Sequence, residues 1–300
     1  MRLIGLHITK CAGTSLVSTI KRGLDLSEYY LCSSIYENIK QHHPEIFERE
    51  DIKAIRFIYG HYVHESLRSI FNGNGDIWFT ILRDPKKRLK SEWYQIYKTR
   101  LFNNLEPMSV GEYLSIYSNS MCNEIIRAFP SAVDPSRSRL DAAKQALSNF
   151  HYVFDIEDFD KIIGILQDFL EIHSSQRNLI IENETLGNEL LNNDKYLRSL
   201  DELEKAYDAS LSDDALLYKS AAISNPALIG NCEPLRGYDR WDDSLSIGHS
   251  QAMEAFMRHL GKYYRGEMVL AGGLAETSRQ IDSRLNWLSF LRTEIMGNPR

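Results

Sequence analysis

The stretch Leu3–Leu16, LIGLHITKCAGTSL, constrains the fold more than any other part of the chain. An apolar run, Leu3–Ile8, is followed by a short polar segment, Thr9–Ser15, and an apolar-periodic segment begins at Leu16. This order predicts a buried strand, a tight loop and a helix that runs from about Ser15 to about Arg22. Such a loop directs backbone N–H groups and a helix N-terminus toward one point, which suits a bound phosphate group.

The polar loop is similar to the Walker A phosphate loop, but it departs from that motif. Lys10 supplies a positive charge, and Thr14 and Ser15 supply hydroxyl groups. The Walker A pattern, G-x-x-x-x-G-K-[ST], places its lysine late in the loop, directly after a glycine. In this chain the lysine comes early, on the strand side, and the loop contains no Gly-Lys pair. The stretch therefore indicates either an anion-binding loop of another type or an ordinary turn with polar surface residues.

Composition and charge exclude several classes of protein. The 300 residues are 43% hydrophobic and 25% charged, so the chain can bury a sizeable core in one large domain or two smaller ones. The formal net charge of −6 argues against a general nucleic-acid-binding protein, although a local basic pocket is compatible with it.

The chain carries the features of a cytoplasmic protein. The first strand begins at the third residue, so we expect no secretory signal. No uncharged apolar run approaches the roughly 20 residues that cross a bilayer, so we expect no membrane span. The four cysteines have no metal-binding spacing, and we expect free thiols in a reducing compartment and no metal site; they are Cys11, Cys32, Cys122 and Cys232.

Three further apolar runs are typical of buried strands, and they lie at residues 54–59, 77–82 and 152–155. Helical patterns separate them, which is the order found in α/β proteins. We therefore predict a P-loop-like three-layer α/β fold, in which helices flank a mostly parallel sheet. We assign residues 1–230 to this domain and residues 231–300 to a helical C-terminal extension packed on it, because Ile281–Ile295 carries an amphipathic pattern.

Two of these strands end in residues that can bind or react. The run 54–59 ends at Gly60-His61, and the run 77–82 is followed by Arg83-Asp84-Pro85, where a helix to about Thr99 is expected. Ligands bind beyond the carboxyl ends of strands in open α/β sheets, so both strand ends are candidate site positions. The alternative for His61 and the nearby His64 is a pair of exposed loop histidines.

The helix predicted at Pro85 has an unusually basic start, with Lys86, Lys87, Arg88 and Lys90. Cations near a helix N-terminus oppose the helix macrodipole, and a bound anion would remove that conflict. The alternative is a solvated basic face in which Arg88 pairs with Asp84.

The segments ITKCAGTSL and FTILRDPKKRLKSEWY together resemble the sulfotransferases that use 3′-phosphoadenosine-5′-phosphosulfate (PAPS). The resemblance is to the carbohydrate type, which includes the heparan and uronosyl 2-O-sulfotransferases and their bacterial relatives. The family's first motif is similar to H-x-P-K-T-[AG]-[GS]-T-[ST]; here Thr9 stands in place of proline and Cys11 in place of threonine. Its second motif is similar to R-D-P-x-x-R-x-x-S-x-[YW], and the matching residues are Arg83, Asp84, Pro85, Arg88 and Ser91.

The resemblance implies a role for each motif. The first motif would bind the 5′-phosphosulfate through Lys10, Cys11, Ala12, Gly13, Thr14 and Ser15, and Lys10 would stabilise the charge on the leaving oxygen. The second would bind the 3′-phosphate through Arg83 and Ser91. By the resemblance to the 2-O-sulfotransferases, the general base would be a histidine after the second core strand, which is His61 here. Other branches of the superfamily use glutamate. His64 and Glu65 therefore stay alternatives for the base, and the scheme requires no metal.

Other segments extend the resemblance to about residue 225. Asn123 and Arg127 match an N-x-x-x-R helix segment, and with His64 and Glu65 they are our candidate acceptor-binding residues. Residues 143–160 and 214–222 are similar to later parts of the family's core.

The resemblance implies a sulfotransferase that moves the sulfuryl group of PAPS to a hydroxyl of an acceptor, which we expect to be a carbohydrate or a small molecule. Two alternatives stay open. A nucleotide-dependent kinase could use a similar loop, although the loop lacks Gly-Lys-[Ser/Thr]. A catalytically silent nucleotide-binding protein could keep the same fold.

Overall fold

The computed structural model describes residues 1–32, 54–65, 67–70, 75–102, 104–134, 136–176, 190, 193–207 and 212–223. All of these belong to the first of the two units into which the chain divides, Met1–Met253. The extension expected at residues 231–300, with its amphipathic segment Ile281–Ile295, lies outside the described residues.

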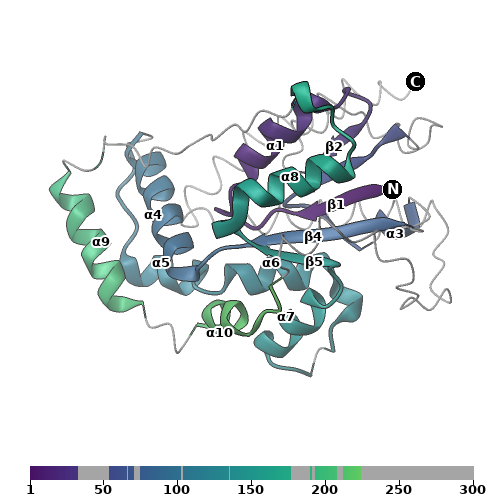
Figure 1. Ribbon diagram of the computed structural model, residues 1–300. Helices are drawn as coiled ribbons and strands as arrows, with labels where there is room; N and C mark the ends of the chain where they lie inside the picture. The colour runs from purple at the N-terminus through teal and green to yellow at the C-terminus, as the bar shows by residue number, and fades with distance from the viewer. Residues whose placement is uncertain are drawn as a thin grey trace, which may run out of the picture. The chain divides into compact units, whose positions relative to one another are not determined.

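A parallel sheet of five strands lies at the centre of this unit (Figure 1). The strand order is β2-β3-β1-β4-β5, and every neighbouring pair is parallel. The strands are β1 (Arg2–Leu6), β2 (Tyr29–Leu31), β3 (Phe57–Gly60), β4 (Asp76–Leu82) and β5 (Tyr152–Asp155). The α/β fold class is therefore confirmed, and four of the strands lie where the apolar runs predict them. The sequence pattern did not predict β2.

Helices cover both faces of the sheet, which gives the three layers (Figure 1). Helices α1 and α8 lie on one face, α6 and α7 on the other, and α4, α5 and α9 lie beyond the end of the sheet that carries the strands' carboxyl ends. Their bounds are α1 (Gly13–Ile20), α3 (Leu67–Ile70), α4 (Pro85–Phe102), α5 (Val110–Tyr117), α6 (Ser120–Ala128), α7 (Arg139–Leu147), α8 (Phe159–Phe169), α9 (Asp194–Ala206) and α10 (Asp213–Ser220). Short 3₁₀ turns lie at η1 (Lys21–Gly23), η4 (Pro130–Ala132), η5 (Ile156–Asp158) and η6 (Ser174–Gln176).

The main core lies between the sheet and helices α1 and α8. Side chains alternate between the two faces of a strand, so Leu3, Phe57 and Phe79 all point to this face, where apolar residues of α1 and α8 cover them. Gly5 occupies the same face, one residue before the end of β1. The rings of Tyr59 and Phe79, its neighbours on β3 and β4, stack over it with centroids 5.9 Å apart. A Cβ at Gly5 would lie 2.4 Å from Phe79 and 2.5 Å from Tyr59, so this packing requires glycine.

The opposite face and the far helices form separate packing units. On the opposite face Trp78 packs against Phe129, and the guanidinium of Arg68 lies 4.7 Å from the centre of each ring. Beyond the carboxyl ends of the strands, aromatic residues such as Trp93 and Tyr113 join α4, α5 and α9 in a second apolar cluster. This second cluster positions α4, which carries the predicted second motif.

Candidate functional site

The strand order defines one switch point of the sheet, and in open α/β sheets the ligand crevice lies at such a point. From β1 the chain crosses over to β2, on one side of β1, and from β4 it continues to β5, on the other side. Because β1 and β4 are neighbours, the loops that leave their carboxyl ends separate there, and this is where open α/β sheets bind ligands. The loop after β1 carries the first predicted motif and the loop after β4 carries the second. His61 follows β3, the other neighbour of β1.

The loop after β1 has an unusual backbone. Lys10 and Ala12 have φ angles of 68° and 58°, in the left-handed region that residues other than glycine seldom adopt. The Cys11 N–H donates to the Ile8 oxygen at 3.1 Å, and the Leu16 N–H donates to the Ala12 oxygen at 3.0 Å. These two tight turns start α1 at Gly13, two residues earlier than the sequence pattern predicts, with its N-terminus at the carboxyl edge of the sheet.

The imidazole of His7 lies against this loop. A Cβ at Gly13 would lie 2.1 Å from both Cε1 and Nε2 of His7, so only glycine permits the contact. Of the two loop hydroxyl groups, that of Thr14 belongs to an exposed residue and that of Ser15 to a buried one.

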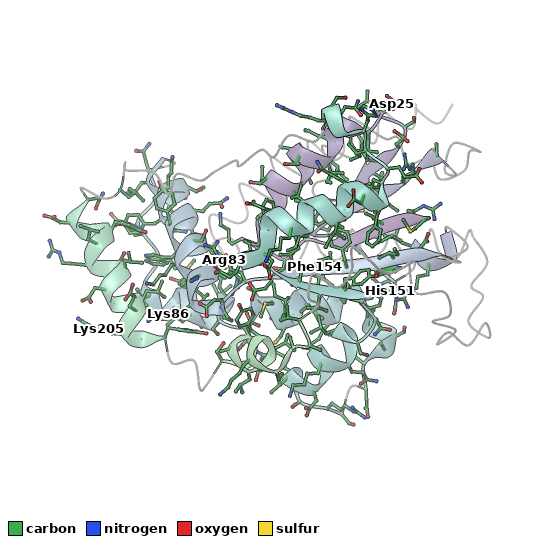
Figure 2. All side chains as sticks on the ribbon, viewed as in Figure 1. Asp25, Arg83, Lys86, His151, Phe154 and Lys205 are labelled. Carbon is green, nitrogen blue, oxygen red and sulfur yellow. The ribbon has the colours of Figure 1, made fainter. Side chains whose placement is uncertain are left out.

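Lys10 and Arg83 bring two cations together at the crevice. The Lys10 Nζ donates to Gln95 Oε1 of α4 at 2.5 Å, and the Arg83 Nη1 donates to the backbone oxygen of Lys10 at 3.1 Å. Figure 2 shows Arg83 at the junction of β4 and α4. Burial lowers the pKa of Lys10, Arg83 acts in the same direction, and Glu92 opposes them. An anion bound here would relieve the repulsion between the two cations.

Helix α4 begins with a capped and largely paired basic turn. Asp84 Oδ1 accepts a hydrogen bond from the Lys87 N–H at 2.9 Å, which is an N-cap contact. The ammonium groups of two lysines pair with acidic residues of other elements, Lys87 with Glu157 at 2.7 Å and Lys90 with Glu204. Arg88 does not pair with Asp84, so that interpretation of the basic turn is wrong. Its side chain points inward instead, and the buried Ser91 lies one turn further along the helix.

A buried ionic cluster joins α4, α6 and α10. Arg88 is fully buried; its Nη1 donates to Glu92 Oε2 at 2.8 Å and its Nη2 donates to Asp214 Oδ2 at 3.3 Å. The Asp214 carboxylate also accepts from the N–H groups of Met121 and Cys122, at 3.0 and 2.8 Å, and so caps α6. Burial raises the pKa of Glu92 to about 7, although Arg88 lowers it. This cluster ties the three helices to one another.

His61 lies in a chain of contacts that leads back to the loop after β1. Its Nδ1 lies 3.9 Å from Glu124 Oε2, and its ring stacks on His7 with centroids 4.1 Å apart. The ring of His7 stacks in turn on Tyr59, at 5.4 Å. Glu124 Oε2 accepts a hydrogen bond from the Thr9 N–H at 3.0 Å. The candidate base and the candidate phosphate loop are therefore joined by His7 and Glu124.

The two alternative bases have different surroundings. His64 is buried, and this burial lowers its pKa to about 4, which makes it a weak base. The carboxylate of Glu65 accepts from the N–H and the hydroxyl of Ser131, at 3.0 and 2.5 Å, and so holds the turn η4. Of the two candidate acceptor-binding residues on α6, Asn123 is exposed and Arg127 is partly buried.

The cysteines within the described ranges are free and buried; they are Cys11, Cys32 and Cys122. Burial raises the pKa of Cys11 to about 12, so its thiol stays protonated and is a poor nucleophile within the loop. Among the described residues, no group of three or more His, Cys, Asp or Glu side chains is arranged to hold a metal ion.

Sequence reasoning missed Glu124, Glu92, Asp214 and the packing role of His7. One signal was available for Glu124. The other buried residues of α6 are Met121, Cys122, Ile125 and Ala128, and Glu124 lies among them on the same helix face. A carboxylate in an otherwise apolar stripe needs a polar partner, and that need points to a functional or ionic contact.

No protein-family model matches the chain, and no curated protein matches it significantly. Within the residues that the structure describes, no helix combines the length and the apolar character needed to cross a membrane.

Proposed function

We propose that this protein is a PAPS-dependent sulfotransferase that transfers the sulfuryl group to a hydroxyl of an acceptor, either a carbohydrate or a small molecule. One observation carries the proposal. The loop with Lys10, the strand end with Arg83 and the strand end with His61 belong to three adjacent strands, β1, β4 and β3, whose carboxyl ends lie side by side at one edge of the sheet.

The groups at the crevice suit a donor with two separate anionic ends. The N–H groups of Gly13 and Thr14, at the start of α1, have no hydrogen-bond acceptor among the described residues. Together with the ammonium of Lys10 they form a site for the 5′-phosphosulfate. Arg83 and Ser91, on the β4 side of the crevice, are assigned to the 3′-phosphate. The two anionic ends of the donor would then lie on either side of the β1–β4 boundary.

The transfer needs charge stabilisation at one end of the reacting group and a proton acceptor at the other. As the bond from sulfur to the bridging oxygen breaks, negative charge develops on that oxygen, and Lys10 stabilises it. The attacking hydroxyl loses its proton to His61 as its oxygen bonds to sulfur. Positioning and charge stabilisation supply most of the rate increase, as in phosphoryl transfer, and the base adds about 10²–10⁴-fold.

Two measurements test the proposal. Calorimetry compares the binding of adenosine 3′,5′-bisphosphate (PAP), 5′-AMP and ATP with magnesium. Incubation with ³⁵S-labelled PAPS and pools of glycans and small hydroxyl compounds shows whether sulfate is transferred. We expect PAP to bind most tightly and label to appear in at least one product. Tight magnesium-dependent ATP binding with ATP turnover would support a kinase instead, and PAP binding without any transfer would support a silent nucleotide-binding protein.

A variant of Arg83 tests the assignment of the 3′-phosphate. A charge-assisted hydrogen bond contributes about 1.5–3 kcal/mol, which corresponds to roughly 10- to 150-fold in affinity. Arg83→Ala should therefore weaken PAP binding by about this factor and 5′-AMP binding much less. Lys86→Ala is the matched control, because it removes the same charge from an exposed position three residues along. Equal losses for the two nucleotides, or an equal loss in the control, would contradict the assignment.

A further inference from the structure

The carboxylate of Glu124 connects the two parts of the site that the proposed reaction must hold together. Its Oε2 accepts a hydrogen bond from the Thr9 N–H, in the loop after β1, and lies 3.9 Å from Nδ1 of His61, after β3. Glu124 itself comes from α6, 115 residues after Thr9, and is only 5% exposed. One buried oxygen thus contacts both the donor loop and the candidate base.

Glu124 is a charged partner for His61. Burial alone would raise the pKa of its carboxyl, but the interactions with His61, Arg127 and Arg88 outweigh burial, and the pKa lies below its ordinary value. The side chain is therefore ionised at neutral pH. A buried carboxylate beside an imidazole favours the tautomer that carries its proton on the facing nitrogen and stabilises the imidazolium ion.

The surroundings of His61 give its two ring nitrogens different roles. The His61 side chain is 22% exposed, but its Nδ1 is shielded from solvent. The exposed surface therefore belongs to the other atoms of the side chain. On one side the ring of His7 packs against it. Burial, and then His61 and Lys10, lower the pKa of His7 well below its usual value, so His7 stays neutral and does not compete for the proton. The arrangement leaves Nε2 as the nitrogen that can meet a substrate.

We propose that Glu124 is a positioning residue that holds His61 as the Nδ1–H tautomer and, through Thr9, fixes the donor loop in register with it. This inference rests on the proposed function, because it takes His61 as the base. In the transfer, the acceptor oxygen bonds to sulfur while the bond from sulfur to the donor's phosphate oxygen breaks, and that oxygen leaves with the electron pair. The acceptor proton passes to Nε2 of His61. Catalytic hydrogen bonds are often long before substrates bind, and we expect the 3.9 Å separation to shorten to a hydrogen bond in the complex.

The charged and titratable groups around this pair come from several elements. His7 and Glu124 face His61 directly. The titratable groups whose charges interact with that of Glu124 are His61, Arg127, Arg88, Glu92, Cys11 and Tyr59. A change of charge at Glu124 therefore acts on His61, whose Nδ1 lies 3.9 Å from the Glu124 carboxylate.

The experiment compares three variants of the full chain. Glu124→Gln removes the charge and keeps an oxygen that can accept from the Thr9 N–H. Glu124→Asp keeps the charge on a shorter side chain, and it also serves if the glutamine variant does not fold. Glu112→Gln, the same substitution at an exposed position of α5, is the control. For each variant we measure kcat against pH with labelled PAPS and PAP affinity by calorimetry.

We expect a distinctive result for the loss of charge. Glu124→Gln should lower kcat by about 10- to 100-fold, a part of the effect of a general base, and should move the acid limb of the pH–rate profile to lower pH. Its PAP affinity should stay within about threefold of the native protein, because the Thr9 contact is kept. Glu124→Asp should keep the acid limb near its native position, and Glu112→Gln should behave as the native protein.

A spectroscopic measurement tests the same contact without any turnover. Long-range ¹H–¹⁵N spectra report the tautomer and the titration of each of the nine histidines, and a His61→Gln sample identifies the His61 signals. We expect the Nδ1–H tautomer in the native protein, and a titration midpoint of His61 that falls in Glu124→Gln. These results would support the inference even if no acceptor were found and the sulfotransferase proposal failed.

Two outcomes would overturn the inference. The first is an Nε2–H tautomer for His61 in the native protein. The second is a Glu124→Gln variant that loses PAP affinity and kcat together while the acid limb and the His61 titration stay unchanged, because Glu124 would then only support the loop.

Discussion

The substitution Asp214→Asn tests whether the buried ionic cluster holds the site-bearing helices together. Asp214 and Arg88 are both fully buried, and the Asp214 carboxylate accepts hydrogen bonds from Arg88 and from the N–H groups of Met121 and Cys122. Asparagine has nearly the same shape but no charge, and it offers one acceptor oxygen and one donor nitrogen where aspartate offers two acceptors. At least one N–H donor of the cluster would then face the donor nitrogen of the new side chain.

The expected cost follows from these contacts. Removing one partner of a buried ion pair leaves the other charge poorly compensated and destabilises proteins by about 3–5 kcal/mol. Glu92 would still pair with Arg88, but burial raises its pKa to about 7, so it carries only part of a negative charge at neutral pH. We therefore expect Asp214→Asn to lower the free energy of unfolding by about 3–5 kcal/mol, against totals of about 5–15 kcal/mol for typical domains.

Urea unfolding at pH 7, followed by circular dichroism, measures this loss. Asp213→Asn is the control, since it makes the same change one residue earlier in α10. The Asp213 carboxylate lies 3.8 Å from Arg139, and the side chains of this pair are 31% and 46% exposed. Exposed pairs of this kind contribute about 0–1 kcal/mol, so the control should lose no more than that.

A loss below about 1 kcal/mol in Asp214→Asn, or equal losses in the two variants, would refute the reasoning. Arg88 would then be stabilised mainly by the Tyr117 backbone oxygen, which its Nη2 contacts at 2.8 Å, and by Glu92. A changed slope of free energy against urea concentration would show instead that the unfolding is no longer two-state.

Three further predictions concern the site and its surroundings. Gly13→Ala should destabilise the protein and weaken PAP binding, because its Cβ would lie 2.1 Å from the His7 ring. The control is Gly164→Ala, in the interior of α8, where the new Cβ meets no neighbouring side chain within 4 Å; it should raise the free energy of unfolding by about 0.5–1 kcal/mol. Urea unfolding of both variants checks this. Burial lowers the pKa of His64 to about 4, so the folded protein binds a proton at His64 less readily than the unfolded chain does. The free energy of unfolding should therefore fall by about 2–3 kcal/mol as the pH drops from 7 to 4.5. Urea unfolding at pH 7 and pH 4.5 measures this fall, and in His64→Gln the fall should be smaller by about the same amount. An equal fall in the native protein and the variant would contradict the prediction. In the proposed reaction Lys10 acts on charge that develops in the transition state, so Lys10→Ala should lower kcat and leave PAP binding nearly unchanged; a near-native kcat would exclude that role.

The sequence predicted the sheet well because its central strands are buried on both faces. Such strands appear as short continuous apolar runs, and the runs at 54–59 and 77–82 correspond to β3 and β4. Strand β2 is different, since its three residues, Tyr29–Leu31, are too few for a periodic pattern and polar residues flank them. Its position depends on pairing with β3, which local sequence does not reveal.

The candidate site could be predicted as far as it depends on strand ends. Lys10, Arg83 and His61 each follow a strand by one to four residues, so the order of the strands alone brings them to one edge. The partners that hold them could not be predicted in this way. Glu124 meets Thr9 across 115 residues and Asp214 meets Arg88 across 126, and such contacts depend on how the helices pack. A single sequence shows only that these carboxylates lie among apolar neighbours.

The position of Asp214 in the chain has a consequence for how the protein matures during synthesis. The five strands that the structure describes are complete by Asp155, so this sheet and the helices over it can form while the ribosome is still translating the later segments. Helices α4 and α6 lack the Asp214 partner of Arg88 and the cap for Met121 and Cys122 until residue 214 has emerged. Nascent chains that end before α10 would carry a formed sheet and an incomplete site, and the proposed nucleotide binding would arise as a late step of biosynthesis.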